Sequence, residues 1–351
     1  MDRFVENSDK ILGYFLSNLA KQGGLQTARE IIQQPALWLS TWRLLLEKKD
    51  ELGSFLQEAG RDGSPDIILT GAGTSAFIGN ILQGPFMKHT GNQTRAVAST
   101  DLITHPRNYF KKQGTTLLIS FARSGDSPES VAASELAEIC CDKVYHLIIT
   151  CNPSGKLAKG NRKFPTCVFL LPPESDDQSL VMTGSFSAML LAGLLISRIG
   201  ELEQLEDEMQ RLSAYGSRVI EQYSDKLKEI AGMDFKRAVF LGSGPLQGAA
   251  RESHLKIQEL SGGKIICKCD SFLGFRHGPK AVINSSTLLI YLFSSDPFVH
   301  QYETDFVKSV NHGEKGLCQI GIFESGENNL GLDEVIAFSE DREKLDEDFL
   351  S

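Results

Sequence analysis

The feature of this sequence that most constrains its fold is a glycine loop and an apolar strand that occur twice at one spacing. Gly242 lies 171 positions after Gly71 in a similar glycine loop, and Thr287 lies 171 positions after Thr116 in a similar apolar segment. Because loop and strand keep their spacing, the pattern predicts two tandem copies of one α/β unit. Chance recurrence of buried-strand composition is the alternative.

Short apolar segments alternate with helix-forming stretches along the chain. In the first copy these segments are residues 66–70, 116–120, 145–150 and 167–171. Segments of this kind, separated by helices, predict parallel strands buried on both faces of a sheet. A helix is expected after Pro128, because proline suits the first helical turn. Asp270 follows Asp101 at an offset of 169 and extends the match between the copies.

The two copies divide the chain into three parts. We expect an N-terminal helical segment over 1–50, a first domain over 51–213 and a second domain over 214–351. Thr27 and Glu30 fit a capping box, and Pro35 is placed to open the next helix. The acidic stretch 201–208, between the copies, is interpreted as a solvated helical face.

Composition excludes several classes of protein. A chain of 351 residues with 41% hydrophobic residues predicts two globular domains. The net charge of −9 argues against a nucleic-acid binder, whose affinity depends on clustered Lys and Arg. The seven cysteines form no CxxC pair and no zinc-ligand spacing, which favours reduced thiols in the cytoplasm and no metal site. There is no apolar signal segment, and the apolar stretch 189–196 is too short to cross a bilayer. We interpret it as a buried helix.

Residues 71–76 (GAGTSA) form the first candidate binding loop. Glycines after a strand let the chain turn tightly, and the N-terminus of the following helix attracts anions. The loop also fits the dinucleotide pattern G-x-G-x-x-A, but residues 96–99 lack the acidic side chain that this pattern needs roughly 20 positions on. Since Thr74 and Ser75 add hydroxyls, a single phosphate is favoured over a nicotinamide dinucleotide.

Residues 123–127 (RSGDS) form the second candidate loop, with a guanidinium and two hydroxyls at the end of a strand. Ligands of open α/β sheets bind at this edge, and hydroxyls together with backbone amides suit a phosphomonoester. The alternative is an ordinary helix cap formed by Asp126 and Ser127. For residues 182–187, which open the apolar helix, capping and ligand contact are equally good explanations.

Two segments of the second copy carry groups for acid–base chemistry. Glu252, Lys256 and Glu259 are spaced i, i+4, i+7 and therefore share one face of a predicted helix. They can form an acid–base pair, although spacing alone favours a surface ladder of salt bridges. His277 lies in a tight turn over residues 274–280, where an imidazole can act as an acid or a base. An ordinary turn histidine is equally consistent with this pattern.

Together these motifs resemble the sugar isomerase (SIS) domain superfamily, and within it the galactosamine-6-phosphate deaminase family, also called tagatose-6-phosphate aldose/ketose isomerases. The segments that carry the resemblance are residues 68–79, 119–133, 241–253 and 274–280. The resemblance implies an α/β fold of two tandem flavodoxin-like SIS units, each a parallel sheet between helices, with a phosphosugar held between them. The chain is also similar to the isomerase half of glucosamine-6-phosphate synthase.

The resemblance implies a role for each candidate residue. Glu259 would be the base that moves a proton between C2 and C1, Lys256 would hold a sugar hydroxyl or the developing enediol charge, and His277 would assist ring opening. In the synthase relatives this histidine comes from a neighbouring subunit, which implies a homodimer or higher homo-oligomer. The implied substrate-binding residues are Gly73, Thr74, Ser75, Arg123, Ser124, Ser127, Thr183 and Ser185.

The resemblance therefore predicts an enzyme that converts galactosamine 6-phosphate to tagatose 6-phosphate and ammonia without a metal or other cofactor. The alternatives are aldose–ketose isomerisation of a phosphosugar without ammonia release, and a phosphosugar-binding module without turnover. No nucleic-acid or membrane partner is expected. The family usually continues past the last strand with a long helix and a tail over the site, whereas residues 346–351 end where that helix would begin.

Overall fold

The first unit of the fold is a five-stranded parallel sheet with the order β4-β3-β5-β6-β7. The computed structural model describes residues 10–326, 329–340 and 344–350. The strands of this sheet are β3 (Asp66–Thr70), β4 (Thr94–Ala96), β5 (Thr115–Ala122), β6 (Lys143–Thr150) and β7 (Thr166–Leu170). The four apolar segments predicted as strands are therefore confirmed, with ends shifted by a few residues.

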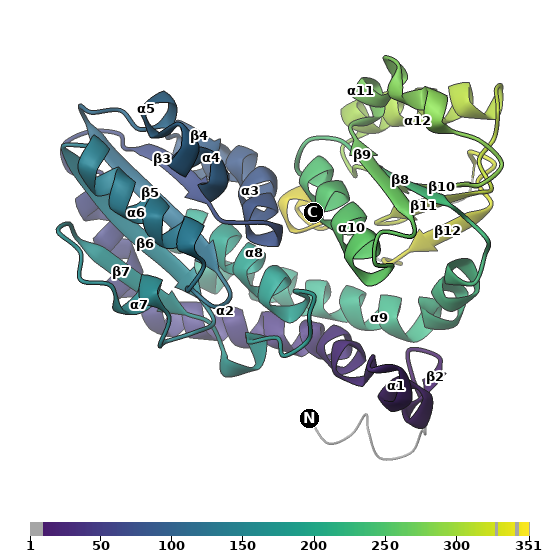
Figure 1. The fold of residues 1–351 in the computed structure, drawn as a ribbon, viewed down its shortest axis with the longest axis horizontal. Helices are drawn as coiled ribbons and strands as arrows, with labels where there is room; N and C mark the ends of the chain where they lie inside the picture. Colours follow the sequence, from purple (N-terminus) through teal and green to yellow (C-terminus); the bar gives the residue numbers. More distant parts are fainter. Residues whose placement is uncertain (1–9, 327–328, 341–343, 351) are drawn as a thin grey trace.

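The second unit is another five-stranded parallel sheet, with the order β12-β11-β10-β8-β9. Its strands are β8 (Arg237–Gly242), β9 (Ile266–Asp270), β10 (Thr287–Leu292), β11 (Cys318–Phe323) and β12 (Glu334–Ala337). Counted along the chain, both sheets have the strand order 2-1-3-4-5, which is that of flavodoxin-like folds. The predicted pair of α/β units is thus confirmed, and the two units lie side by side (Figure 1).

Helices cover both faces of the first sheet. On one face α2, α3 and α8 pack against Ile67, Ile119 and Phe121, and on the other α4 and α6 pack against Ile68 and Leu118. This alternation follows from the two-residue period of a strand. The helices of this unit are α2 (Leu25–Ala59), α3 (Thr74–Thr90), α4 (Ser99–Thr104), α5 (Pro106–Tyr109), α6 (Pro128–Cys140), α7 (Lys156–Lys159), η1 (Pro173–Ser175) and α8 (Gly184–Ser197).

The second sheet is covered in the same way. An aromatic cluster of α11 and α12 packs on Val239 and Tyr291, while α9 and α10 cover Phe240 and Ile290. The helices of this part are η2 (Ile199–Leu205), α9 (Glu206–Ala231), α10 (Pro245–Leu260), α11 (Phe272–Arg276), η3 (Pro279–Val282), α12 (Pro297–Asn311) and η4 (Glu347–Phe349). Before α2 lie a short hairpin and a helix: β1 (Lys10–Ile11), β2 (Tyr14–Phe15) and α1 (Leu16–Gln22).

The N-terminal region differs from the sequence prediction. Pro35 does not open a helix, because α2 continues through it and is 35 residues long. Thr27 and Glu30 lie inside this helix and form no capping box. Packing of α2 against α8 and α9 outweighs the local cost of a helical proline, and Ser213 Oγ donates to the Pro35 carbonyl at 2.9 Å. The expected boundaries at 50 and 213 fall within α2 and α9.

One match between the copies is wrong. Asp270 is the last residue of β9, whereas Asp101 lies within α4. Because strand pairing in each sheet fixes the register, these two residues do not occupy equivalent places. The two glycine loops occupy equivalent places, and so do the strands β5 and β10. The offset of 171 residues therefore aligns these parts of the two units.

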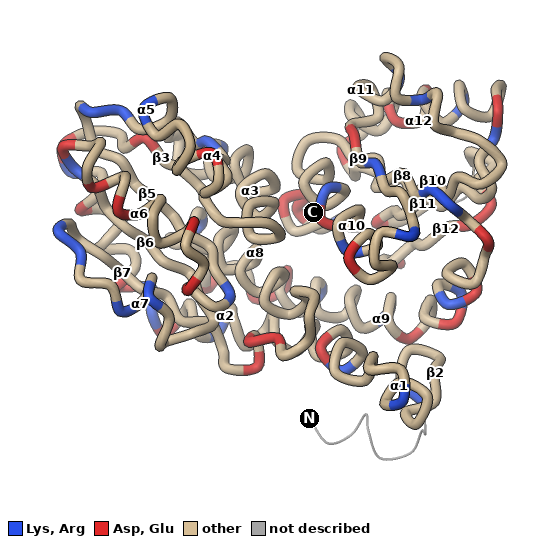
Figure 2. Tube along the Cα trace, in the orientation of Figure 1, with Lys and Arg blue, Asp and Glu red and all other residues tan. Residues whose placement is uncertain are grey.

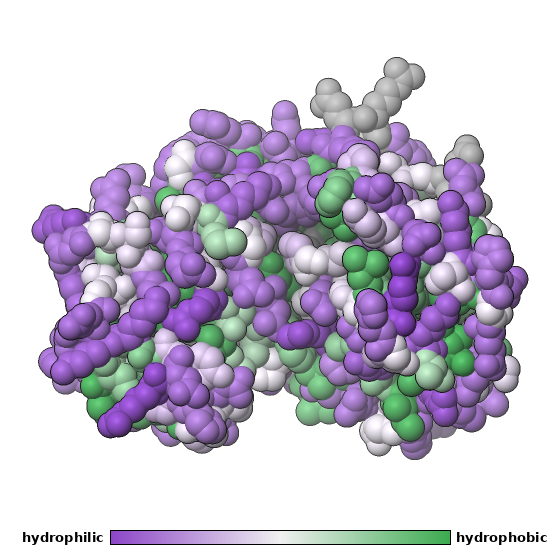
Figure 3. Space-filling model, turned by 90° about the horizontal axis from the view of Figure 1, so that it is seen from above, coloured by the Kyte–Doolittle hydropathy of each residue, from purple (hydrophilic) through white to green (hydrophobic). Residues whose placement is uncertain are grey.

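The surface and the apolar helix agree with the composition. Charged residues of both signs are interspersed over both units (Figure 2), and hydrophilic and hydrophobic residues alternate on the face seen from above (Figure 3). The apolar stretch 189–196 lies in α8, which is buried in the core as predicted. Among the described residues, no single helix is long and apolar enough to span a membrane. Only the helices over 184–197 and 199–231, taken together, reach that length and apolarity, and this pair is bent by 110°.

Candidate active site

The glycine loop after β3 turns the chain directly into α3. Gly73 has φ 57° and ψ −128°, and Gly244, at the same place before α10, has φ 55° and ψ −126°. Such a positive φ is open to glycine and strained for other residues. At Gly71 a Cβ atom would lie 2.7 Å from the Ser75 backbone, so this position also requires glycine. The two loops share one backbone conformation, which explains why their sequences recur.

Thr74 and Ser75 begin α3, and both are buried. The N-terminus of α3 lies at this edge of the sheet, where the positive end of the helix dipole favours an anion. Ser75 Oγ lies 4.0 Å from Met182 Sδ, so the loop is in contact with the segment that leads into α8.

The loop after β5 joins the same edge, because β5 is the neighbour of β3. Gly125 has φ 68° and lets the chain turn. Ser127 caps α6 by accepting a hydrogen bond from the Ser130 N–H at 3.3 Å, so the capping function predicted as an alternative is present. Ser124 Oγ accepts from the Asp126 N–H at 3.3 Å, and an Arg123 N–H donates to the Ser179 carbonyl at 3.3 Å.

The hydroxyls at the start of α8 are engaged by a carboxylate. Asp177 is 5% exposed and accepts hydrogen bonds from the backbone and hydroxyl of both Thr183 and Ser185, at 2.6–3.0 Å. It also accepts from the Gly184 N–H at 3.1 Å. An acidic side chain thus already neutralises this helix N-terminus. The structure places Thr183 and Ser185 close to the site but with their donors directed to Asp177, and their substrate role stays a prediction.

The ammonium of Lys256 joins the two units. Its Nζ atom lies 2.9 Å from Thr74 Oγ1, 2.7 Å from Glu259 Oε2 and 3.2 Å from Glu252 Oε1. Three predicted residues, Thr74, Lys256 and Glu259, are therefore brought together, although they come from different units. A carboxylate and an ammonium beside a phosphate-type loop can act as a base and as a stabiliser of negative charge.

Helix packing produces this contact. The helices α3 and α10 face each other between the sheets and run antiparallel, since Thr74 lies near Lys256 while Ile81 lies near Gly248 (Figure 1). At Gly248 a Cβ atom would lie 2.9 Å from the Ile81 backbone nitrogen, so only glycine permits this approach. An Arg251 N–H donates to Asn80 Oδ1 at 3.0 Å and adds a polar contact between the helices.

Glu252 is the residue of this cluster that the sequence analysis did not assign to the site. Its Oε1 atom accepts from Thr74 Oγ1 at 3.3 Å, and its side chain is 8% exposed against 37% for Glu259. Burial raises the pKa of the Glu252 carboxyl, against the opposing attraction of Lys256. The i, i+4 spacing was visible in the sequence, but the interpretation as a surface ladder is wrong for Glu252, because α3 covers it.

His277 is not part of this cluster within the chain. It follows α11, before Gly278 with φ 113°, so the predicted turn is confirmed. The side chain is exposed, and its ring has no hydrogen bond within the described residues. Its catalytic role therefore stays a prediction that depends on a second subunit.

The equivalent edge of the second sheet is covered by the end of the chain. Glu347 hydrogen-bonds to Ser294 after β10, Lys344 Nζ donates to the Ser295 carbonyl at 3.1 Å, and the Leu345 N–H donates to Glu324 Oε1 at 2.7 Å. The first sheet's edge is thus the better candidate for a substrate.

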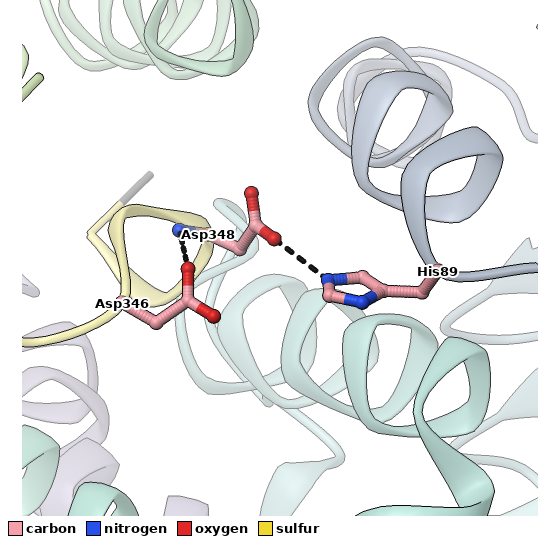
Figure 4. Close-up of side chains that lie close together, drawn as sticks. All are labelled: His89, Asp346 and Asp348. Carbon is pink, nitrogen blue, oxygen red and sulfur yellow. Dashed lines mark hydrogen bonds and ion pairs between the residues drawn. The ribbon is translucent and has the colours of Figure 1, made fainter.

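The same C-terminal segment is tied to the first unit by charges. Asp348 Oδ2 lies 2.7 Å from His89 Nε2 (Figure 4) and 2.8 Å from Lys88 Nζ, and Asp346 Oδ2 lies 2.9 Å from Arg198 Nη1. A histidine and two aspartates at this distance resemble a metal-ligand set. Because two cationic side chains already pair with the carboxylates, we interpret the group as a salt-bridge network.

Two flavodoxin-like sheets, with phosphate-type loops on one unit and an acid–ammonium pair supplied by the other, define a protein of the sugar isomerase (SIS) class. No protein-family model matches the chain. A D-galactosamine-6-phosphate deaminase AgaS from Shewanella sp. (strain ANA-3) is 38% identical over 338 residues, which cover 94% of this chain and 85% of that protein. The chain belongs to the galactosamine-6-phosphate deaminase family.

Solved structures agree with this assignment. The crystal structure of tagatose-6-phosphate ketose/aldose isomerase from Escherichia coli has a TM-score of 0.86 at 36% identity, covering 94% of this chain and 89% of that one. A structure from Clostridium novyi NT has a TM-score of 0.93 at 40% identity, covering 98% of this chain and 89% of that one. The family and fold predicted from the motifs are confirmed.

Proposed function

We propose that this protein converts galactosamine 6-phosphate and water to tagatose 6-phosphate and ammonia. The observation that carries the proposal is the contact of Lys256 with both Thr74 and Glu259, at 2.9 and 2.7 Å. It brings a carboxylate of the second unit to the phosphate-type loops of the first. A hexose 6-phosphate has its anion at one end and its reacting carbons, C1 and C2, at the other, which suits such an arrangement.

The chemistry follows from the groups present. Ring opening exposes the C1 aldehyde, which makes the C2 proton acidic. Glu259 takes that proton, leaving an enolamine between C1 and C2 whose charge Lys256 stabilises. Glu259 then returns the proton to C1, which gives a C2 imine. Water hydrolyses the imine to the ketose and ammonia, so atoms and electrons balance without a redox partner.

The phosphate is held by the two loops of the first unit. Hydroxyls of Thr74, Ser75, Ser124 and Ser127, the guanidinium of Arg123 and the helix N-termini of α3 and α6 supply donors and positive potential. Gly73 allows the backbone to approach the anion. These side chains have partners within the protein, so phosphate binding would exchange such partners for phosphate oxygens.

His277 acts in the neighbouring subunit of a homodimer in this proposal. The exposed imidazole of His277 has no hydrogen bond within the described residues that a second copy would have to break. In the site of that second copy it would give its proton to the ring oxygen of the sugar. Size measurement in solution, combined with mixing of inactive His277→Ala and Glu259→Gln chains, tests this. Recovered activity in the mixture supports a shared site, and no recovery from mixed dimers contradicts it.

Product assays test the reaction itself. The protein is supplied with galactosamine 6-phosphate, glucosamine 6-phosphate and the corresponding sugar phosphates without nitrogen. Ammonia and tagatose 6-phosphate in equal amounts from the first compound support the proposal. Ammonia release from none of the amino sugars contradicts it.

Plain aldose–ketose isomerisation is the second candidate, and the Escherichia coli structure similar to this chain is named for that reaction. Its distinguishing result in the same assays is ketose formation from a nitrogen-free sugar phosphate with no ammonia from the amino sugars. A phosphosugar-binding module would bind these compounds and convert none of them.

A further inference from the structure

Three oxygens surround the ammonium of Lys256. It donates hydrogen bonds to Thr74 Oγ1 and Glu259 Oε2 at 2.9 and 2.7 Å and forms an ion pair with Glu252 Oε1 at 3.2 Å. An ammonium has three N–H groups, so each already has one close oxygen. One of the three partners must therefore move before Lys256 can stabilise charge on the substrate.

Burial indicates which partner moves. Glu259 lies in the last turn of α10, is 37% exposed and has Lys256 as its one hydrogen-bond partner within the described residues. Glu252 lies in the middle of α10, is 8% exposed and also accepts the Thr74 hydroxyl. Moving Glu252 would break a hydrogen bond with Thr74 and an ion pair with Lys256 beneath α3, whereas moving Glu259 breaks its contact with Lys256 at the surface.

Glu252 in turn depends on these two partners. Its Oε2 atom is buried and has no hydrogen-bond partner among the described residues. A buried carboxylate with so few partners is costly to keep charged, so Lys256 and Thr74 stabilise it while it holds them in place. The three groups form one coupled unit.

We propose, on the basis of the function proposed above, that Glu252 is a positioning residue that anchors Lys256 and Thr74 while Glu259 leaves to take the C2 proton. The N–H that Glu259 vacates then faces the developing charge of the enolamine. The two carboxylates that contact Lys256 thus have different roles: the buried Glu252 stays in place and the exposed Glu259 reacts. Glu252 acts through Lys256 and does not touch the substrate.

Kinetics of Glu252→Gln test the proposal, because glutamine keeps the shape and an acceptor oxygen but removes the charge. We expect kcat to fall at least about tenfold, as for loss of a hydrogen bond to a charged group, and KM to change less than about threefold. Glu252→Gln combined with Lys256→Met should be no slower than Lys256→Met alone, since the effect passes through the lysine. Glu229→Gln, which alters the exposed Lys226–Glu229 pair on α9, is the control and should match the wild type.

A second measurement needs no substrate. Acetylation of Lys256 by a limiting amine reagent, followed by mass spectrometry, reports how firmly the ammonium is held. In Glu252→Gln we expect Lys256 to react at least about threefold faster relative to Lys226, with the melting temperature recorded for each variant. If the wild type releases no ammonia, the proposed function is wrong, but the labelling result still tests whether Glu252 holds Lys256 in place. Wild-type kcat per folded molecule together with unchanged Lys256 labelling would overturn the inference.

Discussion

The Nζ atom of Lys256 lies 2.9 Å from the Oγ1 atom of Thr74, although the two residues belong to helices of different units. This hydrogen bond connects the acid–base pair of α10 to the loop that follows β3. Because Glu259 lies 2.7 Å from the same Nζ atom, the Lys256–Thr74 hydrogen bond also holds the candidate base near the phosphate-type loops. Lys256 therefore connects the candidate base of one unit to the phosphate-type loop of the other.

Removing the Thr74 hydroxyl should weaken this connection. Thr74→Val keeps the shape of the side chain but gives Lys256 no oxygen, so we expect kcat/KM to fall about 10- to 100-fold, in line with loss of a hydrogen bond to a charged group. Thr74→Ser restores the oxygen and should recover most of the activity. Equal activity of the valine and serine variants would contradict the role of this contact.

Arg123 should act on phosphate binding rather than on the chemical step. Arg123→Met removes the guanidinium that we propose pairs with the phosphate, and we expect KM to rise about 10- to 100-fold with kcat changed by less than about threefold. Arg107, an exposed arginine of α5, provides the control, and Arg107→Met should leave both constants unchanged. A fall in kcat at constant KM would place Arg123 elsewhere in the reaction.

Two glycines should respond to alanine substitution in opposite directions. Gly73→Ala forces an alanine into φ 57°, ψ −128°, and we expect a loss of about 1–3 kcal/mol in the free energy of unfolding. Gly53 is a helical position of α2 where an added Cβ would meet nothing within 4 Å, so Gly53→Ala should gain about 0.5–1 kcal/mol. Urea unfolding of both variants measures this, and the account is wrong if they shift the same way.

Burial of Glu303 should make stability depend on pH. Its carboxyl is fully buried, accepts from the Ser294 N–H at 3.0 Å, and has its pKa raised by burial to about 7. A raised pKa in the folded state contributes stability below about pH 4.5, the value for an unfolded glutamate, and this contribution is lost as the pH rises through about 7.

Glu303→Gln keeps the acceptor and stays neutral at every pH. The variant should therefore equal the wild type near pH 4.5 and be more stable at pH 8, by at most about 3 kcal/mol. Asp305→Asn, on the exposed side of the same helix, should show no such gain. Melting curves at both pH values decide, and a gain of equal size at the two values would contradict the assignment.

Local patterns predicted the scaffold well because they express backbone constraints. The positive φ of Gly73 and Gly244 permits only glycine, so the repeat was visible in the sequence. The burial of Glu252 was not, because it depends on α3 lying over α10 rather than on spacing. In the same way, packing allows Pro35 to lie inside α2. The loop residue Asp177 accepts hydrogen bonds from the hydroxyls of Thr183 and Ser185, which were predicted to bind a substrate.

The rate of ammonia release from galactosamine 6-phosphate by Glu259→Gln, compared with the wild type, tests the central claim most directly. The account predicts that the variant keeps its melting temperature and loses about 10²–10⁴-fold in kcat, because glutamine cannot take the C2 proton. Ammonia release by Glu259→Gln at the rate of the wild type would contradict the account.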